Sequence, residues 1–124
     1  MSFCTAINCM DGRIQLPVIQ FLQKRFAAAY VDMITEPGPI RILSEQADGS
    51  KIDAILQRLN ISVEIHFSQS LAVIGHHDCA GNPVSEAEQI DQIKKSVLYL
   101  KNKHPQLDVI GLWVDANWKV NEVV

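Results

Sequence analysis

Residues 75–81 read Gly-His-His-Asp-Cys-Ala-Gly, and this stretch decides both the fold and the candidate site. The apolar residues 71–74 precede it, and such a run before a glycine-bounded loop is typical of a buried strand in a parallel sheet. Open α/β folds bind their ligands at the carboxyl ends of these strands. His76 and Cys79 have the His-x-x-Cys spacing of paired metal ligands, a motif too short to be specific alone.

A second cluster of ligand-type residues follows another short apolar run. Residues 3–8 are strand-like and lead into residues 9–13, which read Cys-Met-Asp-Gly-Arg. If the two strands are parallel neighbours, Cys9, His76 and Cys79 converge at one edge of the sheet. Two thiolates and one imidazole without a fourth protein ligand are typical of a zinc site with an open position. The two motifs together therefore predict a metal site that performs chemistry.

Composition indicates one globular domain. The chain has 124 residues, of which 48% are hydrophobic and 20% charged, and its net charge is -3. This length is sufficient to bury a core, and the slightly acidic balance without basic runs argues against nucleic acid as a partner. Neither a signal peptide nor a membrane span is recognisable, and three cysteines without disulfide-framework spacing fit a reducing compartment. We expect a cytoplasmic protein that does not contact a membrane.

Strand and helix patterns alternate along the chain. Besides residues 2–8 and 70–75, buried strands are expected at residues 30–35 and 108–114, and residues 119–124 are expected to return as an antiparallel strand. The predicted fold class is α/β, with a mostly parallel central sheet of about four strands, an antiparallel C-terminal edge strand, and helices packed on the faces.

Three helices and one loop connect these strands. Pro17 suits the first turn of the first helix, and Ser50 is a plausible N-cap for a second helix that runs to about Phe67. Ser85 and Glu88 form a capping box that starts the third. Two prolines and a glycine predict a rigid loop over residues 36–43.

The motifs at residues 9–13 and 75–79 resemble, in the same order, the Cys-x-Asp-x-Arg and His-x-x-Cys motifs of the β-class carbonic anhydrases. Residues 111–115 are similar to the family's closing hairpin. Eight residues precede Cys9, so the sequence resembles a short, divergent member that lacks the family's N-terminal arm. The resemblance implies a single β-carbonic-anhydrase-like domain over residues 1–124. It also implies a zinc-dependent carbonate dehydratase, which hydrates carbon dioxide reversibly to bicarbonate.

The resemblance also assigns roles to individual residues. Cys9, His76 and Cys79 would bind one zinc ion, which lowers the pKa of a bound water to about 7. Asp11 would accept a hydrogen bond from the resulting hydroxide and orient it, while Arg13 keeps the carboxylate ionised and fixed. Two other interpretations remain: Asp11 itself takes the fourth zinc position, or the pair only orders the loop. Because the family builds its site at a dimer interface, a homodimer or higher homo-oligomer is implied.

Other functions remain open on the same scaffold. Residues 35–39 replace the family's Arg-Asn-Ala-Gly run, which favours a catalytically silent zinc-binding module with a regulatory or binding role. A third hypothesis is a hydrolase of carbonyl sulfide or carbon disulfide, because nothing in the sequence identifies the residues that line the substrate pocket. His77 either shuttles protons or faces solvent. Cys4 is assigned to the core, on the strand face opposite Cys9.

Overall fold

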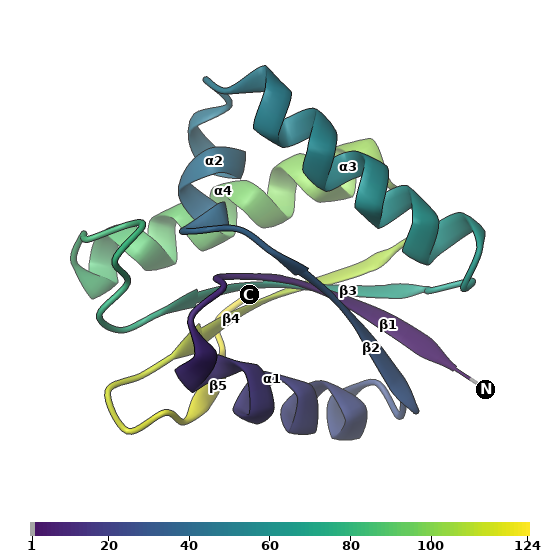
Figure 1. The fold of residues 1–124 in the computed structure, drawn as a ribbon, viewed down its shortest axis with the longest axis horizontal. Helices are drawn as coiled ribbons and strands as arrows, with labels where there is room; N and C mark the ends of the chain where they lie inside the picture. The colour runs from purple at the N-terminus through teal and green to yellow at the C-terminus, as the bar shows by residue number, and fades with distance from the viewer. Residues whose placement is uncertain (1) are drawn as a thin grey trace.

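The computed structural model describes residues 2–124 as one sheet between two helical layers (Figure 1). The sheet has five strands in the order β2-β1-β3-β4-β5. The first four strands of the chain pair in parallel, and the last pairs antiparallel with its neighbour, which confirms the predicted fold class. The strands are β1 (Phe3–Asn8), β2 (Tyr30–Thr35), β3 (Ser70–His76), β4 (Asp108–Val114) and β5 (Val120–Glu122).

Four helices cover the two faces of the sheet (Figure 1). They are α1 (Gly12–Arg25), α2 (Pro39–Glu45), α3 (Gly49–Glu64) and α4 (Glu86–Lys103). Helices α2, α3 and α4 lie on one face and α1 on the other. Alternate residues of the central strands serve the two layers: Ile7 and Val73 pack with α2–α4, whereas Ala6 and Ile74 pack with α1. None of the helices formed by residues 2–124 combines the length and apolarity that a membrane crossing requires.

The connectivity of the sheet creates a natural binding position. From β1 the chain passes through α1 to β2 on one side, and then crosses to β3 on the other side of β1. The carboxyl ends of β1 and β3 therefore flank a topological switch point, where open α/β sheets bind ligands. The β1–β3 ladder stops at Ile7 and Val73, whereas the β3–β4 ladder continues to His76. The two strands thus separate just before the predicted metal ligands.

The first helix begins earlier than the sequence pattern indicated. We expected Pro17 in its first turn, but α1 starts at Gly12, because the Asp11 carboxylate caps it by accepting a hydrogen bond from the Arg13 backbone N–H at 2.9 Å. Pro17 lies inside the helix. The predicted start was therefore wrong, and the cap belongs to the candidate site.

Two further boundaries differ from the predictions. The prediction of a rigid loop over residues 36–43 was wrong from Pro39 onward, where α2 begins, because Pro39 occupies one of the first helical positions and a missing N–H costs nothing there. The N-cap of α3 is Asp48 rather than Ser50, since the Asp48 carboxylate accepts a hydrogen bond from the Lys51 backbone N–H. That helix ends at Glu64, short of the predicted end near Phe67. The Ser85 cap is confirmed.

Candidate metal centre

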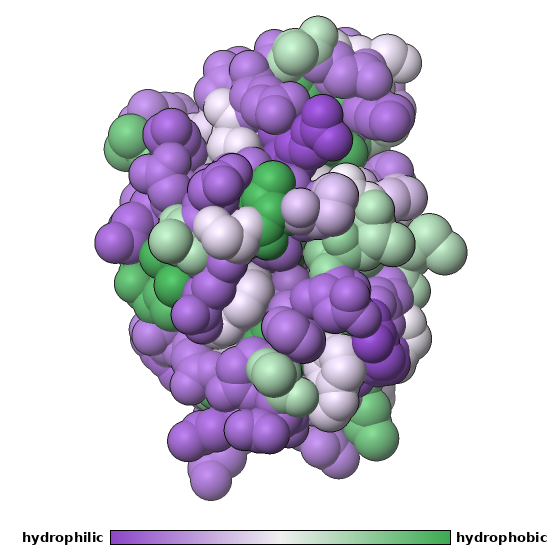
Figure 2. All heavy atoms as spheres, turned by 90° about the vertical axis from the view of Figure 1, so that its left-hand side faces the viewer, coloured by the Kyte–Doolittle hydropathy of each residue, from purple (hydrophilic) through white to green (hydrophobic). Residues whose placement is uncertain are grey.

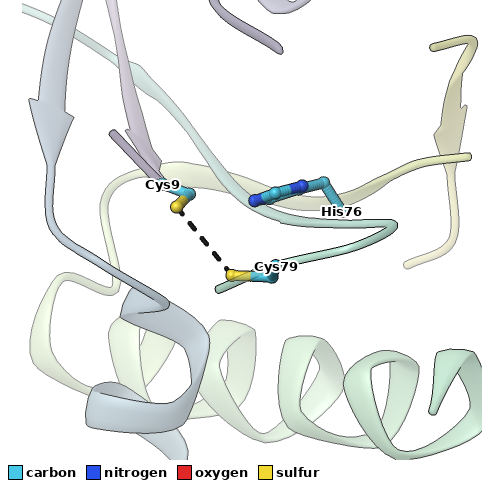
Figure 3. Close-up of side chains that lie close together, drawn as sticks. All are labelled: Cys9, His76 and Cys79. Atoms are coloured by element: carbon cyan, nitrogen blue, oxygen red, sulfur yellow. Dashed lines mark hydrogen bonds between the residues drawn. The ribbon is translucent and has the colours of Figure 1, made fainter. Parts of the chain in front are cut away.

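Three side chains from the two predicted motifs converge at the switch point. Cys9 follows β1, His76 ends β3, and Cys79 lies in the loop before α4; Figure 3 shows them pointing toward one another. Their ligand atoms all lie within 4.8 Å of one another, and the two sulfurs are 3.9 Å apart. All three are buried, with exposed fractions of 4%, 1% and 5%. The face of the molecule that lies on the left in Figure 1 is mostly hydrophilic, with a few apolar patches (Figure 2).

The imidazole of His76 is oriented for a ligand. Its Nδ1 lies 2.8 Å from the His77 carbonyl oxygen, to which it donates when it carries the proton. That hydrogen bond leaves Nε2 with a free lone pair, and Nε2 is buried without a hydrogen-bond partner. A buried polar atom without a partner is costly in a native protein, and a bound metal ion would satisfy it. Burial lowers the pKa of His76, but the nearby Cys9 sulfur and the His77 carbonyl oxygen outweigh burial, so the pKa lies above its ordinary value.

The two thiols form a coupled pair. The Cys79 thiol donates to the Cys9 sulfur, which lowers the pKa of Cys9, while this interaction and burial raise the pKa of Cys79. The backbone N–H groups of Asp11 and Gly38 also lower the pKa of Cys9, and those of Gly81 and Asn82 partly offset the rise in the pKa of Cys79. Such donors stabilise thiolates, the form in which cysteine binds a metal. The donor set therefore fits a soft or borderline divalent cation.

Two glycines let the loops around these sulfurs cross at close range. A Cβ on Gly81 would lie 2.7 Å from the Pro37 carbonyl carbon and 3.0 Å from the Gly38 nitrogen. A Cβ on Gly38, whose φ is +58°, would lie 2.8 Å from the Asn82 Cβ. Only residues without side chains allow this approach. The Gly38 backbone N–H is also one of the groups that lower the pKa of Cys9.

Asp11 and Arg13 form an ion pair beside the three ligand-type side chains. The Arg13 guanidinium donates to both oxygens of the Asp11 carboxylate, through Nη2 at 2.7 Å and through Nε at 3.0 and 3.2 Å. Those hydrogen bonds lower the pKa of Asp11 to about 2, so the carboxylate is ionised at neutral pH. Of the residues from 2 to 124, only Cys9, His76 and Cys79 form a group able to hold a metal, and Asp11 is not part of it.

Arg13 also links the two loops of the site. Its Nη1 donates to the Asp78 carboxylate at 3.2 Å, and its Nη2 donates to the Asp78 backbone carbonyl at 3.1 Å. The Trp118 ring lies under the guanidinium, 4.6 Å from its carbon to the ring centroid. The φ of Trp118 is +59°, an uncommon value for a bulky residue. Arg13 is therefore held by groups from three separate segments.

Comparison with known proteins agrees with these motifs. Residues 1–124 match the model of a protein family described as "Putative carbonic anhydrase". The chain belongs to this family. No curated protein matches it in sequence.

Solved structures show that the fold of this carbonic anhydrase family member is shared with β-class enzymes. A carbonic anhydrase from Glaciozyma antarctica has a TM-score of 0.65 and 20% identity, over 97% of this chain and 81% of that one. A β-carbonic anhydrase of Aspergillus fumigatus has a TM-score of 0.56 and 15% identity, over 98% and 74%. Tetrameric β-carbonic anhydrases from Sordaria macrospora have a TM-score of 0.51 and 14% identity, over 96% and 79%. The resemblance to the β class is thus confirmed at the level of family and fold.

The remaining predicted residues of this family member divide between surface and core. His77 is exposed, and its backbone N–H donates to the Val114 carbonyl oxygen. Cys4 is fully buried, as expected, and burial raises its pKa to about 11. It packs in the same core cluster as Cys9, so the prediction of opposite faces was wrong. The strand ends at Asn8, and the alternation of side chains does not extend to Cys9.

Sequence patterns did not predict the contacts of two glutamines near the site. Gln15 lies on α1, and its Nε2 donates to the Cys9 and Asp11 carbonyl oxygens at 2.8 and 2.7 Å. Gln89 lies on α4 and binds the main chain of His76. The sequence does contain one indication for Gln89. It lies on the same helix face as the apolar residues of α4, and a polar residue at such a buried position needs a hydrogen-bond partner.

Proposed function

We propose that the protein is a zinc-dependent carbonic anhydrase that interconverts carbon dioxide and bicarbonate. The observation that carries this proposal is the buried, unpartnered Nε2 of His76 facing two thiols whose sulfurs are 3.9 Å apart. Two thiolates and one imidazole suit zinc, whereas magnesium and calcium prefer oxygen ligands. The metal ligands would be Cys9, His76 and Cys79. When bound, zinc lowers the pKa of a coordinated water to about 7 and so makes a nucleophile available at neutral pH.

Asp11 and Arg13 would supply the orientation that the reaction needs. Because Arg13 occupies both carboxylate oxygens and keeps the group ionised, Asp11 remains an acceptor fixed in one place. An ionised carboxylate accepts a hydrogen bond from the attacking hydroxyl group and turns its lone pair toward carbon dioxide. The contacts with Arg13 favour this role over that of a fourth metal ligand. We therefore assign Asp11 to catalysis and Arg13 to its support.

We further propose that the chain acts as one domain in a homo-oligomer, a homodimer or larger. Among residues 2–124 the edge strand β2 pairs only with β1, and apolar side chains are exposed on β2, on α3, which contacts β2, and on the loop after α3. Tyr30 belongs to β2 itself, and Ile61, Ile65 and Phe67 come from α3 and the loop after it. A second copy would bury this apolar surface. Carbon dioxide and bicarbonate would be its small-molecule partners in the cytoplasm.

Stopped-flow measurement of carbon dioxide hydration tests the activity. The full chain, loaded with about one zinc ion per chain as a three-ligand site requires, is expected to be active between about pH 7 and pH 9. Asp11→Asn keeps the N-cap acceptor but removes the charge, and it is expected to lower kcat/KM on the order of 100-fold. Asp78→Asn is the matched control, because its carboxylate also binds Arg13 but is largely exposed to solvent. It should lower kcat/KM far less.

The assay also separates the competing functions. A zinc-loaded wild type without hydration activity would favour a catalytically silent module or a different small electrophile, such as carbonyl sulfide or carbon disulfide. Equal losses in Asp11→Asn and Asp78→Asn would contradict the role given to Asp11. Folded wild-type protein that binds no metal would overturn the proposal as a whole.

A further inference from the structure

Gln89 makes an unusual set of contacts with the main chain of the candidate metal site. Its side-chain Oε1 accepts a hydrogen bond from the His76 backbone N–H at 3.1 Å. Its Nε2 donates to the His76 carbonyl oxygen at 2.9 Å and to the Asn82 carbonyl oxygen at 3.3 Å. The side chain is buried, with 2% exposed. One amide therefore binds the backbone N–H and the backbone carbonyl of His76 and also the far end of the loop that contains Cys79.

These contacts replace a missing strand. The β1–β3 ladder ends at Val73, so the last residues of β3 have no β1 partner on that side. On the other side β3 still pairs with β4, where His76 lies opposite Val114. A buried backbone N–H and carbonyl left unpaired would each cost free energy comparable to a lost hydrogen bond. Gln89 satisfies both groups at the point where the strands separate to form the site.

Gly75 makes the approach of Gln89 possible. A Cβ at this position would lie 2.8 Å from the Gln89 Oε1 and 2.7 Å from the Ile40 Cδ1. The Gly75 position therefore faces α2 and α4. Because neighbouring residues of a strand point to opposite faces, the His76 side chain lies on the other face of the sheet. Gln89 thus binds the His76 peptide from the side opposite the imidazole.

We propose that Gln89 is a positioning residue of the metal centre. By fixing the His76 peptide relative to the Asn82 carbonyl, it sets the distance between the His76 imidazole and the Cys79 thiol before any metal binds. This inference rests on the proposed metal-binding function and assigns to it a residue that no motif contains. Partners that orient metal ligands typically contribute a factor of about 10 to 100 in metal affinity.

The test compares two variants of the full chain that both lose a buried polar group from α4. Gln89→Met keeps the length of the side chain and removes all three hydrogen bonds. Ser96→Ala is the control, because Ser96 is fully buried on the same helix but donates to the Ile40 carbonyl oxygen and not to the main chain of His76 or Asn82. Zinc affinity is measured by competition with a chromophoric chelator. The geometry is measured by the absorption spectrum of the Co²⁺-substituted protein.

Gln89→Met is expected to bind zinc about 10- to 100-fold more weakly and to shift the Co²⁺ bands, whereas Ser96→Ala keeps the wild-type affinity and spectrum. Wild-type affinity and an unchanged Co²⁺ spectrum in folded Gln89→Met would overturn the inference, even if its melting temperature falls. If Gln89→Met does not fold, Gln89→Glu, which keeps an acceptor for the His76 N–H, must bind zinc more weakly than wild type, and wild-type affinity in that variant would overturn the inference. Wild-type protein without metal would instead overturn the proposed function.

Discussion

The two loops that build the metal centre are held in different ways. The loop between β1 and α1 is held by the Gln15 amide and, at the surface, by the ion pair of Arg13 and Asp11, whose side chains are 45% and 18% exposed. The loop between β3 and α4 is stabilised by the amide of Gln89, which is 2% exposed. Exposed ion pairs contribute little and are screened by salt, whereas hydrogen bonds in a buried network are stronger. We infer that both loops supply metal ligands, and that the ion pair of the β1–α1 loop also orients the reactant.

Loss of either thiol should lower the amount of bound zinc by the same factor, although the two loops are held differently. Cys9→Ser and Cys79→Ser, one from each loop, are expected to lower bound zinc equally, from about one ion per chain to a small fraction, because three protein ligands leave no spare. Metal analysis after dialysis checks this. Cys4→Ala is the control. Cys4 is buried but does not belong to the group of three side chains that could hold a metal, so its loss should leave the zinc content unchanged. Full zinc retention in either serine variant would contradict the assignment.

A methyl group at the crossing of the loops should destabilise the protein. In Gly81→Ala the new Cβ would meet Pro37 backbone at 2.7 Å, so the free energy of unfolding is expected to fall by about 1–3 kcal/mol. Denaturant unfolding of the zinc-free protein measures the change without a contribution from the metal. Gly49→Ala is the matched control, because a Cβ at Gly49 meets nothing within 4 Å, and its effect should be neutral or slightly stabilising. Equal effects of the two substitutions would exclude a close crossing.

Removal of the Arg13 charge should have a smaller effect on stability and a distinct pH dependence. Arg13 lowers the pKa of Asp11 from 3.8 to about 2, so the pair stabilises the fold above about pH 4 and loses this contribution as the pH falls toward 2. Arg13→Met is therefore expected to be less stable than wild type at pH 7, with the difference closing between pH 4 and pH 2. Unfolding of chelator-treated protein at several pH values measures this.

The same variant tests whether the ion pair acts on the metal or only on the reactant. Arg13→Met should keep its zinc and lose hydration activity, because it disturbs the orienting carboxylate but none of the metal ligands. Added salt should reduce the wild-type advantage in stability, since the pair is exposed. An Arg13→Met variant that loses zinc as readily as Cys79→Ser would show that the ion pair is also needed to hold the metal.

The sequence allowed prediction of the parts of the site that depend on local patterns. Apolar runs mark the strands, and ligand-type residues directly after residues 3–8 and 70–75 must meet if the strands are parallel neighbours. The helix starts were less accessible, because Asp11 serves both as an N-cap and as part of the site, and Pro39 begins a helix instead of breaking one. The partners of Gln89 could not be predicted. They depend on where β1 and β3 separate, which no local pattern reports.

X-ray absorption spectroscopy at the zinc edge, on the full chain as purified, decides whether these residues hold the metal. We expect two sulfur ligands, contributed by Cys9 and Cys79, with the remaining ligands nitrogen or oxygen. A zinc spectrum without sulfur ligands, or folded protein without bound metal, would contradict the assignment of Cys9, His76 and Cys79.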